Sequence, residues 1–427
     1  MKISPARTAA FDVLLRIEKE RAYSSVLLPM AEEGLSAADR ALCHELTLGT
    51  LRRQLFLDRV IDKFARGKKL DGEVRVALRL GLYQLFFLDR IPRHSAIDES
   101  VKLVKRARKT SASGFTNAIL RRSAVEPPNL SFVDDVDRIS VETSHPRWLI
   151  EKWMRDLGPD NAIRLAEANN TAGAASFRYL KDRAGDNAVS GVRPSAFVDG
   201  CFVADRIDST LLKLAAEGEI YFQDEASQMV AGSVTIPDGG YFLDVCAAPG
   251  GKTGLIESRH RGRAFIAAGD IHRHRAEMLR DNCRRQGADA VSVLQYDAEA
   301  SLPFADGSFD AVLVDAPCTG TGTIRHNPEI RYFLAPDDPA RLSVKQLSIL
   351  KNASNLVKPG GLLVYSTCSL EREENEAVCG QFLSSERLFE LTRPAVDPRF
   401  LTDEGFARTW PDSDTMDGFF IAHFRRV

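Results

Sequence analysis

The chain has 427 residues, of which 44% are hydrophobic and 27% charged, a composition typical of a globular protein with more than one domain. No apolar run approaches the roughly 20 residues that span a bilayer, and residues 1–5 contain no apolar signal core. We therefore expect a cytoplasmic protein without a membrane partner. Seven cysteines without a CxxC pair argue against a disulfide framework and a zinc site, and we expect no metal.

The net charge of −2 hides an asymmetry between the two ends of the chain. Residues 1–125 contain 24 Lys and Arg against 14 Asp and Glu, whereas the remainder contains 33 against 45. A basic module on an acidic body indicates a polyanionic partner bound by the first domain. The alternative is a set of solvated, charged helix surfaces.

The first third of the chain has helical periodicity and no β-branched alternation, so we predict an all-α domain over residues 1–128. Its expected helices cover 9–17, 39–53, 73–88, 95–109 and 114–122. Prolines and a loss of apolar periodicity then predict a linker over 126–145. A small α+β subdomain is expected over 140–230, with two helices followed by short strands and helices.

From residue 231 to 427 apolar strands alternate with helices. Expected strands are 241–246, 264–270, 291–294, 309–315, 361–366 and 419–425, and expected helices are 252–258, 275–286 and 341–356. Continuous apolar strands separated by helices predict a doubly wound, mostly parallel sheet, which is a Rossmann-like α/β domain.

The stretch 242–253 is predicted to be a strand, a glycine-bearing turn and the start of a helix, an arrangement that brings backbone N–H groups to a ligand. A phosphate-binding P-loop would need glycine where Cys246 stands, and the spacing of a dinucleotide fingerprint is absent. A nucleotide-like ligand without a pyrophosphate remains, and S-adenosylmethionine fits.

Acidic residues stand at the ends of the expected strands, where ligands of such sheets bind: Asp244, Asp270, Asp297 and Asp315. Asp270 follows the turn by about 20 residues, the spacing at which a carboxylate reaches ribose hydroxyls. Asp297 could accept a hydrogen bond from the adenine amino group. Each carboxylate alone could instead be a helix cap or a turn residue.

Two cysteines follow neighbouring expected strands, Cys318 after the fourth and Cys368 after the fifth, and we predict that both reach the rim beside the cofactor. Carbon C5 of a pyrimidine is a poor nucleophile until a thiolate adds to C6, so covalent catalysis would explain a thiol there. Asp315 could supply the proton or hydrogen bond at N3, and a second thiol could assist release. Cys246 is expected to line the cofactor pocket, and the remaining cysteines are expected to be packing residues: Cys43, Cys201, Cys283 and Cys379.

The N-terminal motifs at 49–52, 81–85, 91–92 and 115–122 resemble those of NusB-type RNA-binding helical domains. The resemblance covers most of residues 5–125. It implies that basic side chains contact RNA phosphates, and the candidates are Lys102, Lys105, Arg106, Arg108, Lys109, Arg121 and Arg122.

The C-terminal motifs resemble those of RNA cytosine-C5 methyltransferases: 244–252, 315–320, 366–369, 374–376 and 417–420. With a NusB-like front, nearly the whole chain resembles the RsmB/NOP type of bacterial 16S rRNA methyltransferase, whose target is cytosine 967. The resemblance implies an S-adenosylmethionine-dependent enzyme that acts on 16S rRNA not yet fully assembled into the subunit, as a monomer and without DNA.

The resemblance also implies the site residues. Cys368 would attack C6, Cys318 would aid product release and Asp315 would contact the base at N3. The DNA cytosine methyltransferases use a Pro-Cys thiol, which would favour Cys318 instead, but Thr367-Cys368 matches the RNA enzymes. The cofactor would be held by Cys246, Ala247, Ala248, Pro249, Gly250, Gly251, Lys252, Asp270, Asp297 and Asp315.

Two departures from the family pattern stand out. Residues 177–180 lack the usual Arg-Val-Asn, which puts an RNA contact of that subdomain in doubt, and Glu329 replaces a common Asp. The competing interpretation is a non-catalytic RNA-binding protein with a degenerate methyltransferase body. Methylation of tRNA or protein is a third. The target nucleotide and the assembly state of the substrate stay open.

Overall fold

A computed structural model of the chain describes all residues except 1–2, 127 and 182–188. The chain divides into two compact units: Met1–Ala172 with Ile324–Leu334, and Gly173–Thr323 with Ala335–Val427. The expected division at 128, 140 and 231 differs from this one, because the helices up to Ala168 group with the first unit. Within the described residues, no helix is both long and apolar enough to cross a membrane.

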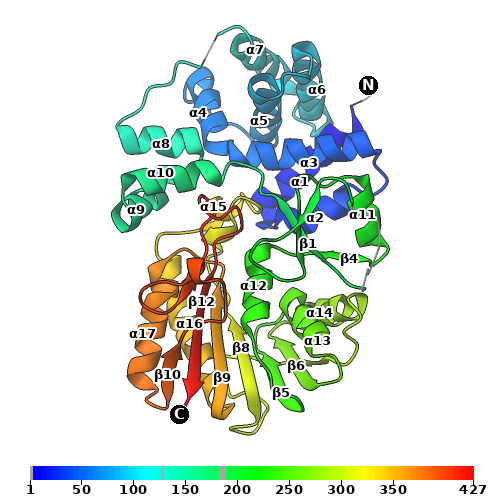
Figure 1. Cartoon of the computed structure of the whole chain (residues 1–427). Coiled ribbons are helices and arrows are strands. Elements are labelled where there is room, and N and C mark those ends of the chain that lie inside the picture. Colours follow the sequence, from blue (N-terminus) through cyan, green and yellow to red (C-terminus); the bar gives the residue numbers. More distant parts are fainter. Residues whose placement is uncertain (1–2, 127, 182–188) are drawn as a thin grey trace. The chain divides into compact units, whose positions relative to one another are not determined.

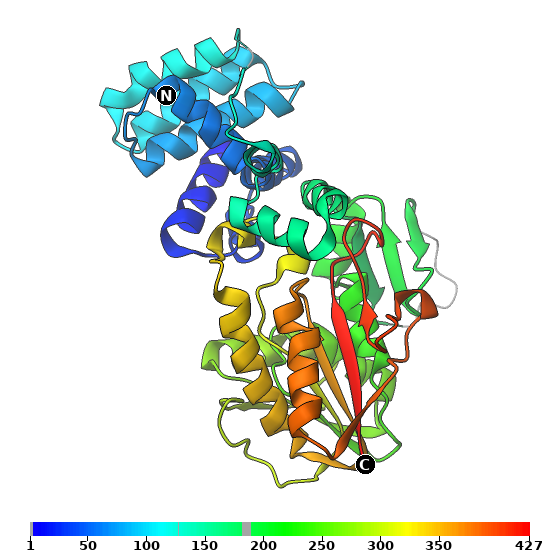
Figure 2. The same ribbon diagram turned by 90° about the vertical axis from the view of Figure 1, so that its left-hand side faces the viewer.

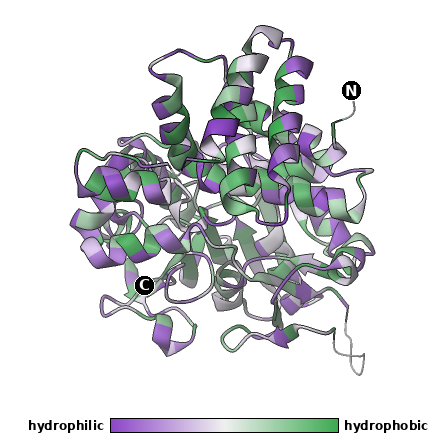
Figure 3. Ribbon diagram, turned by 90° about the horizontal axis from the view of Figure 1, so that it is seen from above, coloured by the Kyte–Doolittle hydropathy of each residue, from purple (hydrophilic) through white to green (hydrophobic). Residues whose placement is uncertain are grey.

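The described part of the first unit is helical, as predicted for the N-terminal domain (Figure 1). Its α-helices are α1 (Pro5–Glu20), α2 (Ser24–Ala31), α3 (Ala37–Arg52), α4 (Gln54–Ala65), α5 (Gly72–Phe87), α6 (Arg93–Arg106), α7 (Ser113–Ser123), α8 (Asp135–Thr143), α9 (Arg147–Leu157), α10 (Pro159–Ala168) and α15 (Ile330–Phe333). Hydrophobic and hydrophilic residues alternate along these ribbons, as amphipathic helices require (Figure 3). Phe11, Leu46 and Leu57 are among the fully buried residues of its core.

The predicted linker over 126–145 is wrong for its second half, which forms α8. Asp134 caps this helix by accepting a hydrogen bond from the N–H of Asp137 at 2.8 Å. Ile139 and Val141 are buried. Apolar periodicity drops in this segment because α8 is short and buries few apolar side chains. The capping residue Asp134 was the clearer indication of a helix here.

A segment from far along the chain, Ile324–Leu334, belongs to the first unit. Arg331 is fully buried there and donates to the carbonyl oxygen of Thr143 at 3.2 Å and to Asn170 Oδ1 at 2.9 Å. Glu329 accepts from Ser24 through the backbone N–H at 2.6 Å and the hydroxyl at 3.0 Å. The connection that follows Cys318 is therefore anchored among the N-terminal helices.

The second unit contains a small antiparallel sheet, ordered β2-β3-β1-β4. Its strands are β1 (Ala175–Tyr179), β2 (Val192–Pro194), β3 (Cys201–Ala204) and β4 (Ile220–Phe222), accompanied by α11 (Ser209–Ala216). Phe177, Leu211 and Ile220 are buried together. This confirms mixed α+β character after residue 173, apart from residues 182–188, which lie outside the description.

The large sheet of the second unit has the order β10-β12-β9-β8-β5-β6-β7, and β11 pairs with β12. Its strands are β5 (Gly240–Asp244), β6 (Ala264–Asp270), β7 (Ser292–Gln295), β8 (Phe309–Asp315), β9 (Val357–Thr367), β10 (Phe389–Thr392), β11 (Ala407–Arg408) and β12 (Phe420–Arg426). Strands β5 to β9 pair in parallel, whereas β12 runs antiparallel to β9 and to β10. The predicted mostly parallel, Rossmann-like sheet is confirmed.

Helices cover both faces of this sheet. They are α12 (Glu225–Ser233), α13 (Gly251–His260), α14 (Arg273–Arg285), α16 (Asp338–Ser354) and α17 (Glu376–Ser385). Along β8, Ala311 and Leu313 pack into a core with residues of α12 and α13, whereas Val312 and Val314 pack into a core with residues of α16 and α17. The alternation follows from the two-residue period of a strand. Figure 2 shows α16 and α17 side by side.

Candidate active site

The glycine turn joins β5 to α13 as predicted. Gly250 has a φ of 104°, and a Cβ at this position would lie 2.9 Å from Leu279 Cδ1, so the turn requires glycine there. The buried Asp244, which ends β5, accepts a hydrogen bond from Thr253 Oγ1 at 2.7 Å. Burial raises the pKa of Asp244 to about 7. Among the described residues its other oxygen, Oδ1, has no partner, so a buried acceptor is available beside the turn.

Strand register places the other predicted site residues at the same edge. Asp244 lies opposite Leu313 of β8, and two residues later Asp315 lies opposite Ser366 of β9. On the other side of β5, Asp270 ends β6 opposite Gln295 of β7. Because these strands are parallel, their carboxyl ends meet, and the turn, Asp270 and Asp315 share one edge of the sheet.

The two carboxylates predicted to hold the nucleoside part of the cofactor have different surroundings. Asp270 is 5% exposed and accepts from Arg275 Nε at 3.0 and 3.1 Å. Arg275 also donates to the carbonyl oxygen of Ala248 at 3.0 Å, which ties Asp270 to the glycine turn. Asp297 accepts from the N–H of Glu299 at 2.9 Å, as a turn residue does. Cofactor contacts by both residues stay predictions.

Lys252 and Asp315 form an ion pair at the centre of the edge. Lys252 Nζ lies 2.8 Å from Asp315 Oδ2, and Ser366 Oγ donates to Asp315 Oδ1 at 2.8 Å. Burial lowers the pKa of Lys252, but the Asp315 carboxylate more than offsets this and the pKa lies above its usual value. Lys252 Nζ also lies 5.0 Å from the centroid of the Phe419 ring. Sequence reasoning placed Lys252 only in the cofactor turn and missed its pairing with Asp315.

The two rim cysteines predicted from sequence meet in the structure. Their sulfur atoms are 3.4 Å apart, although 50 residues separate Cys318 from Cys368. The pKa of Cys318 is raised well above its usual value, first by its hydrogen bond with Cys368 and then by burial. Which of the two thiols attacks and which assists stays a prediction.

The other cysteines behave as expected for packing residues. Cys43, Cys201, Cys283 and Cys379 are each at most 2% exposed. Cys246 lies beside the glycine turn, and its pKa is raised, mainly by burial. Its sulfur packs against the apolar core on the α16 side of the sheet, so it lacks the features of a reactive thiol.

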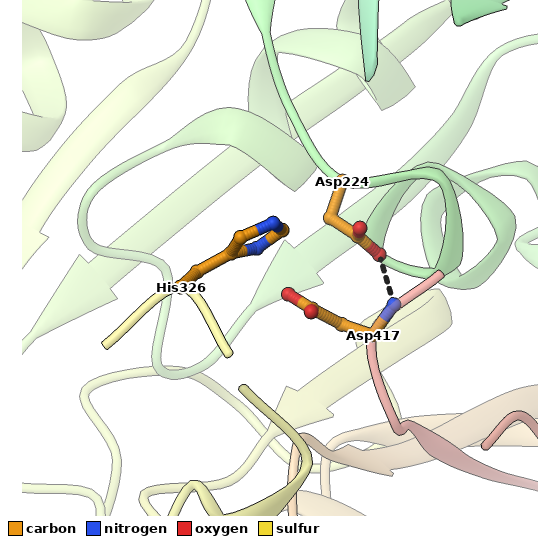
Figure 4. Close-up of side chains that lie close together, drawn as sticks. All are labelled: Asp224, His326 and Asp417. Atoms are coloured by element: carbon orange, nitrogen blue, oxygen red, sulfur yellow. Dashed lines mark hydrogen bonds between the residues drawn. The ribbon is translucent and has the colours of Figure 1, made fainter. Parts of the chain in front are cut away.

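The terminal motif at 417–420 packs beside the cysteine turns. Gly418 donates its N–H to the carbonyl oxygen of Gly322 at 2.9 Å, and Gly322 donates to the carbonyl oxygen of Cys368 at 2.9 Å. Figure 4 shows the N–H of Asp417 directed at the carboxylate of Asp224, at 3.2 Å from Oδ1. That carboxylate also caps α12. The motif thus links the start of α12 to the rim.

The basic residues predicted to contact RNA lie on or beside α6 and α7, and many pair with acidic neighbours. Arg106 contacts Asp12 at 2.7 Å, and Lys109 contacts Asp71 at 3.0 Å. Exposed pairs of this kind contribute little to stability because solvent screens them, so phosphates could compete for these cations. Phosphate contact by any of them stays a prediction.

Arg178, in the segment that departs from the family pattern, points into the second unit. It is 4% exposed, donates to Gln286 Oε1, and lies 5.4 Å from the centroid of the Tyr221 ring. Gln286 in turn donates to the carbonyl oxygen of Gly250 at 3.3 Å. Arg178 therefore supports the helix side of the glycine turn.

Comparison with known proteins assigns both parts of the chain. A family model described as 16S rRNA methyltransferase RsmB/F matches residues 234–425, and the NusB family model matches residues 4–124. A "Probable ribosomal RNA small subunit methyltransferase B" of Bacillus subtilis is 33% identical over 100% of both chains. The chain belongs to the RsmB/F family of 16S rRNA methyltransferases.

Further relatives agree with this assignment. A ribosomal RNA small subunit methyltransferase B of Pseudomonas putida is 33% identical over 88% of both chains. The crystal structure of PH0851 superposes with a TM-score of 0.85 at 26% identity, covering 100% of both chains. Members of this family use S-adenosylmethionine, and the glycine turn, with a free buried acceptor at Asp244, fits the ammonium group of that cofactor.

Proposed function

We propose that this chain transfers a methyl group from S-adenosylmethionine to C5 of a cytosine in 16S rRNA, through a covalent bond between Cys368 and C6 of the base. The observation that supports this most directly is the pair of sulfur atoms 3.4 Å apart, at the sheet edge that also holds the glycine turn and the Lys252–Asp315 pair. An enzyme that methylates oxygen, nitrogen or a protein side chain would have no use for two neighbouring thiols beside the methyl donor.

In the proposed reaction the Cys368 thiolate adds to C6, and the electrons of the C5–C6 double bond move toward C5. N3 takes up a proton from solvent as the adduct forms, and the Asp315 carboxylate, which is oriented by Lys252 and Ser366, accepts a hydrogen bond from that N3–H. The cofactor supplies the methyl group that C5 takes up. Solvent water then takes the protons from C5 and N3, the C5–C6 double bond is restored, and Cys368 leaves as the thiolate. Cys318, whose sulfur lies 3.4 Å from that of Cys368, assists this elimination.

The substrate must present an unpaired, unstacked cytosine, since a base inside a duplex is out of reach. We therefore propose that the enzyme acts on 16S rRNA before full assembly of the subunit, at the position equivalent to cytosine 967. The N-terminal NusB-like helices, with their excess of basic residues, would bind the surrounding RNA through its phosphates.

Two cysteine variants test the assignment of roles. With 16S rRNA and S-adenosylmethionine, Cys318→Ala should accumulate an RNA adduct that survives denaturing electrophoresis, whereas Cys368→Ala should form none. The buried Cys283→Ala is the matched control and should turn over without accumulating adduct. An adduct in Cys368→Ala and none in Cys318→Ala would reverse the roles.

The substrate is tested separately. Tritium transfer from labelled S-adenosylmethionine to bulk rRNA, followed by bisulfite sequencing of rRNA from a deletion strain, should locate one unmodified cytosine in 16S rRNA. Cofactor binding without any transfer to RNA would favour the non-catalytic alternative.

A further inference from the structure

A single buried carboxylate joins the two turns that carry the rim cysteines. Glu374 is 0% exposed and lies between β9 and α17. Its Oε1 accepts from the N–H of Thr319 at 2.9 Å, and its Oε2 accepts from the hydroxyls of Thr319 and Ser369. Thr319 directly follows Cys318, and Ser369 directly follows Cys368.

Glu374 is also connected to the residue before Cys318. Gln346 of α16 donates from Nε2 to Glu374 Oε1 at 2.9 Å and to the carbonyl oxygen of Pro317 at 3.0 Å. Tyr365 of β9 donates its hydroxyl to Gln346 Oε1 at 3.2 Å and to the carbonyl oxygen of Glu374. The backbone on both sides of Cys318 is therefore held by one network.

The donors to the Glu374 carboxylate are neutral groups: one backbone N–H, one amide and two hydroxyls. A buried carboxylate satisfied only by neutral donors costs more free energy than an ion pair at the surface, so its presence calls for a reason. An amide at this position would turn one of its two acceptors into a donor. The hydroxyls of Thr319 and Ser369 would then compete for fewer acceptors.

We propose that Glu374 is a positioning residue for methyl transfer, whose carboxylate ties the Cys318 turn to the Cys368 turn and thereby sets the separation of the two thiols. This inference rests on the proposed function for its catalytic consequence. The contacts of both turns with the Glu374 carboxylate are seen in the structure and do not depend on which reaction the protein catalyses.

The charge of Glu374 has a second consequence for Cys318. The negative carboxylate is one of the groups that raise the pKa of this thiol, after the hydrogen bond with Cys368, burial, and the charge of Cys368. Glu374 therefore helps to keep Cys318 protonated while Cys368 attacks. A residue that only filled space would leave the titration of Cys318 unchanged.

The test uses Glu374→Gln in the full chain, with Glu376→Gln as the matched control. Glu376 is in the same motif, but its carboxylate pairs with Arg408 at 3.1 Å. Because the Cys318 and Cys368 turns are no longer fixed to one carboxylate, kcat for methyl transfer to 16S rRNA should fall roughly 10–100-fold. The KM for S-adenosylmethionine should stay within about twofold of wild type.

A second readout does not depend on methylation. Alkylation of Cys318 by iodoacetamide, followed across pH by mass spectrometry of its peptide, should rise at lower pH in Glu374→Gln than in wild type or Glu376→Gln. Wild-type kcat together with an unchanged alkylation profile in Glu374→Gln would overturn the proposal. A wild-type protein that methylates no cytosine would defeat the proposed function instead and leave the alkylation result to decide the role of Glu374 at the thiols.

Discussion

Strand β8 carries an aspartate–lysine pair at each end, and only one of them lies among reactive groups. At the carboxyl end Asp315 contacts Lys252 at 2.8 Å, and at the amino end Asp310 contacts Lys358 at 2.7 Å. Both lysines lie near an aromatic ring, Phe419 at 5.0 Å and Tyr241 at 5.2 Å respectively. By composition and distance the two pairs are nearly the same.

Their surroundings differ. The second partner of Asp310 is the N–H of Tyr241 at 2.8 Å, so this carboxylate fastens the neighbouring strand. Asp315 is instead oriented by a side chain, Ser366, and is one of the charges that raise the pKa of Cys318. The Lys252 side chain is 13% exposed, against 36% for Lys358. An ion pair therefore takes its chemical role from the groups around it.

The amino edge also shows that a large groove is a poor guide to function. A groove of about 1210 Å³ opens there, lined by the beginnings of β5 to β8. Tyr241 and Phe265 stack in it with ring centroids 4.9 Å apart. It contains neither rim cysteine nor the glycine turn, whereas the carboxyl edge contains all three.

The largest expected difference is between the two aspartates. Asp315→Asn should lower the rate of methyl transfer at least about 100-fold, because the base loses its contact at N3. Asp310→Asn should leave the rate within about twofold, as expected of a change away from the site. Tritium transfer to 16S rRNA under saturating cofactor measures both. Equal losses in the two variants would remove the distinction between the edges.

Substitutions of the two lysines should differ less in their effect on kcat than those of the two aspartates. Lys252→Met leaves Asp315 half-buried without its cation, and we expect about 1–3 kcal/mol less free energy of unfolding, with at least a tenfold lower kcat. Lys358→Met, at the more exposed pair, should cost under about 1 kcal/mol and leave kcat unchanged. Urea denaturation and initial rates give the two quantities. A Lys252→Met enzyme with wild-type kcat would show that orientation by Ser366 suffices.

The smallest effect concerns acid stability at the amino edge. Partial burial raises the pKa of Asp310, but the hydrogen bonds from Lys358 and from the N–H of Tyr241 lower it by more. The pKa of Asp310 therefore lies below its usual value. A lowered folded-state pKa stabilises the protein above the unfolded-state pKa of about 3.9 and loses that contribution as pH falls through the folded-state value. The wild-type advantage over Asp310→Asn in urea should therefore be under about 1 kcal/mol at pH 6 and shrink below pH 4. An advantage that grows on acidification would contradict this sign.

Much of the fold could be predicted from local patterns. The expected strand 309–315 coincides with β8, and the expected 264–270 coincides with β6, because each is mostly apolar and ends at an aspartate. The short helix α8 was missed because few of its residues are apolar. The short strands β10 and β11 give too little pattern to be recognised.

The site was predicted in part. Cys318, Cys368 and Asp315 were placed together because each follows an apolar strand. The pairing of Lys252 with Asp315, 63 residues away, was not. The contacts of Glu374 with the two cysteine turns were not predicted either, because the motif at 374–376 indicated the family but no role for this residue. A charged residue inside a helix or a turn carries no local signal of which distant group it will face.

Residue type and short-range spacing were enough to indicate the alternation of strands and helices in the second half of the chain, the glycine turn and the two rim cysteines. Three features come from the three-dimensional packing instead: which of two similar aspartate–lysine pairs lies beside the thiols, which carboxylate links their turns, and the place of Ile324–Leu334 among the N-terminal helices. The reason is that strand order and long-range packing bring together residues whose spacing along the chain encodes no contact.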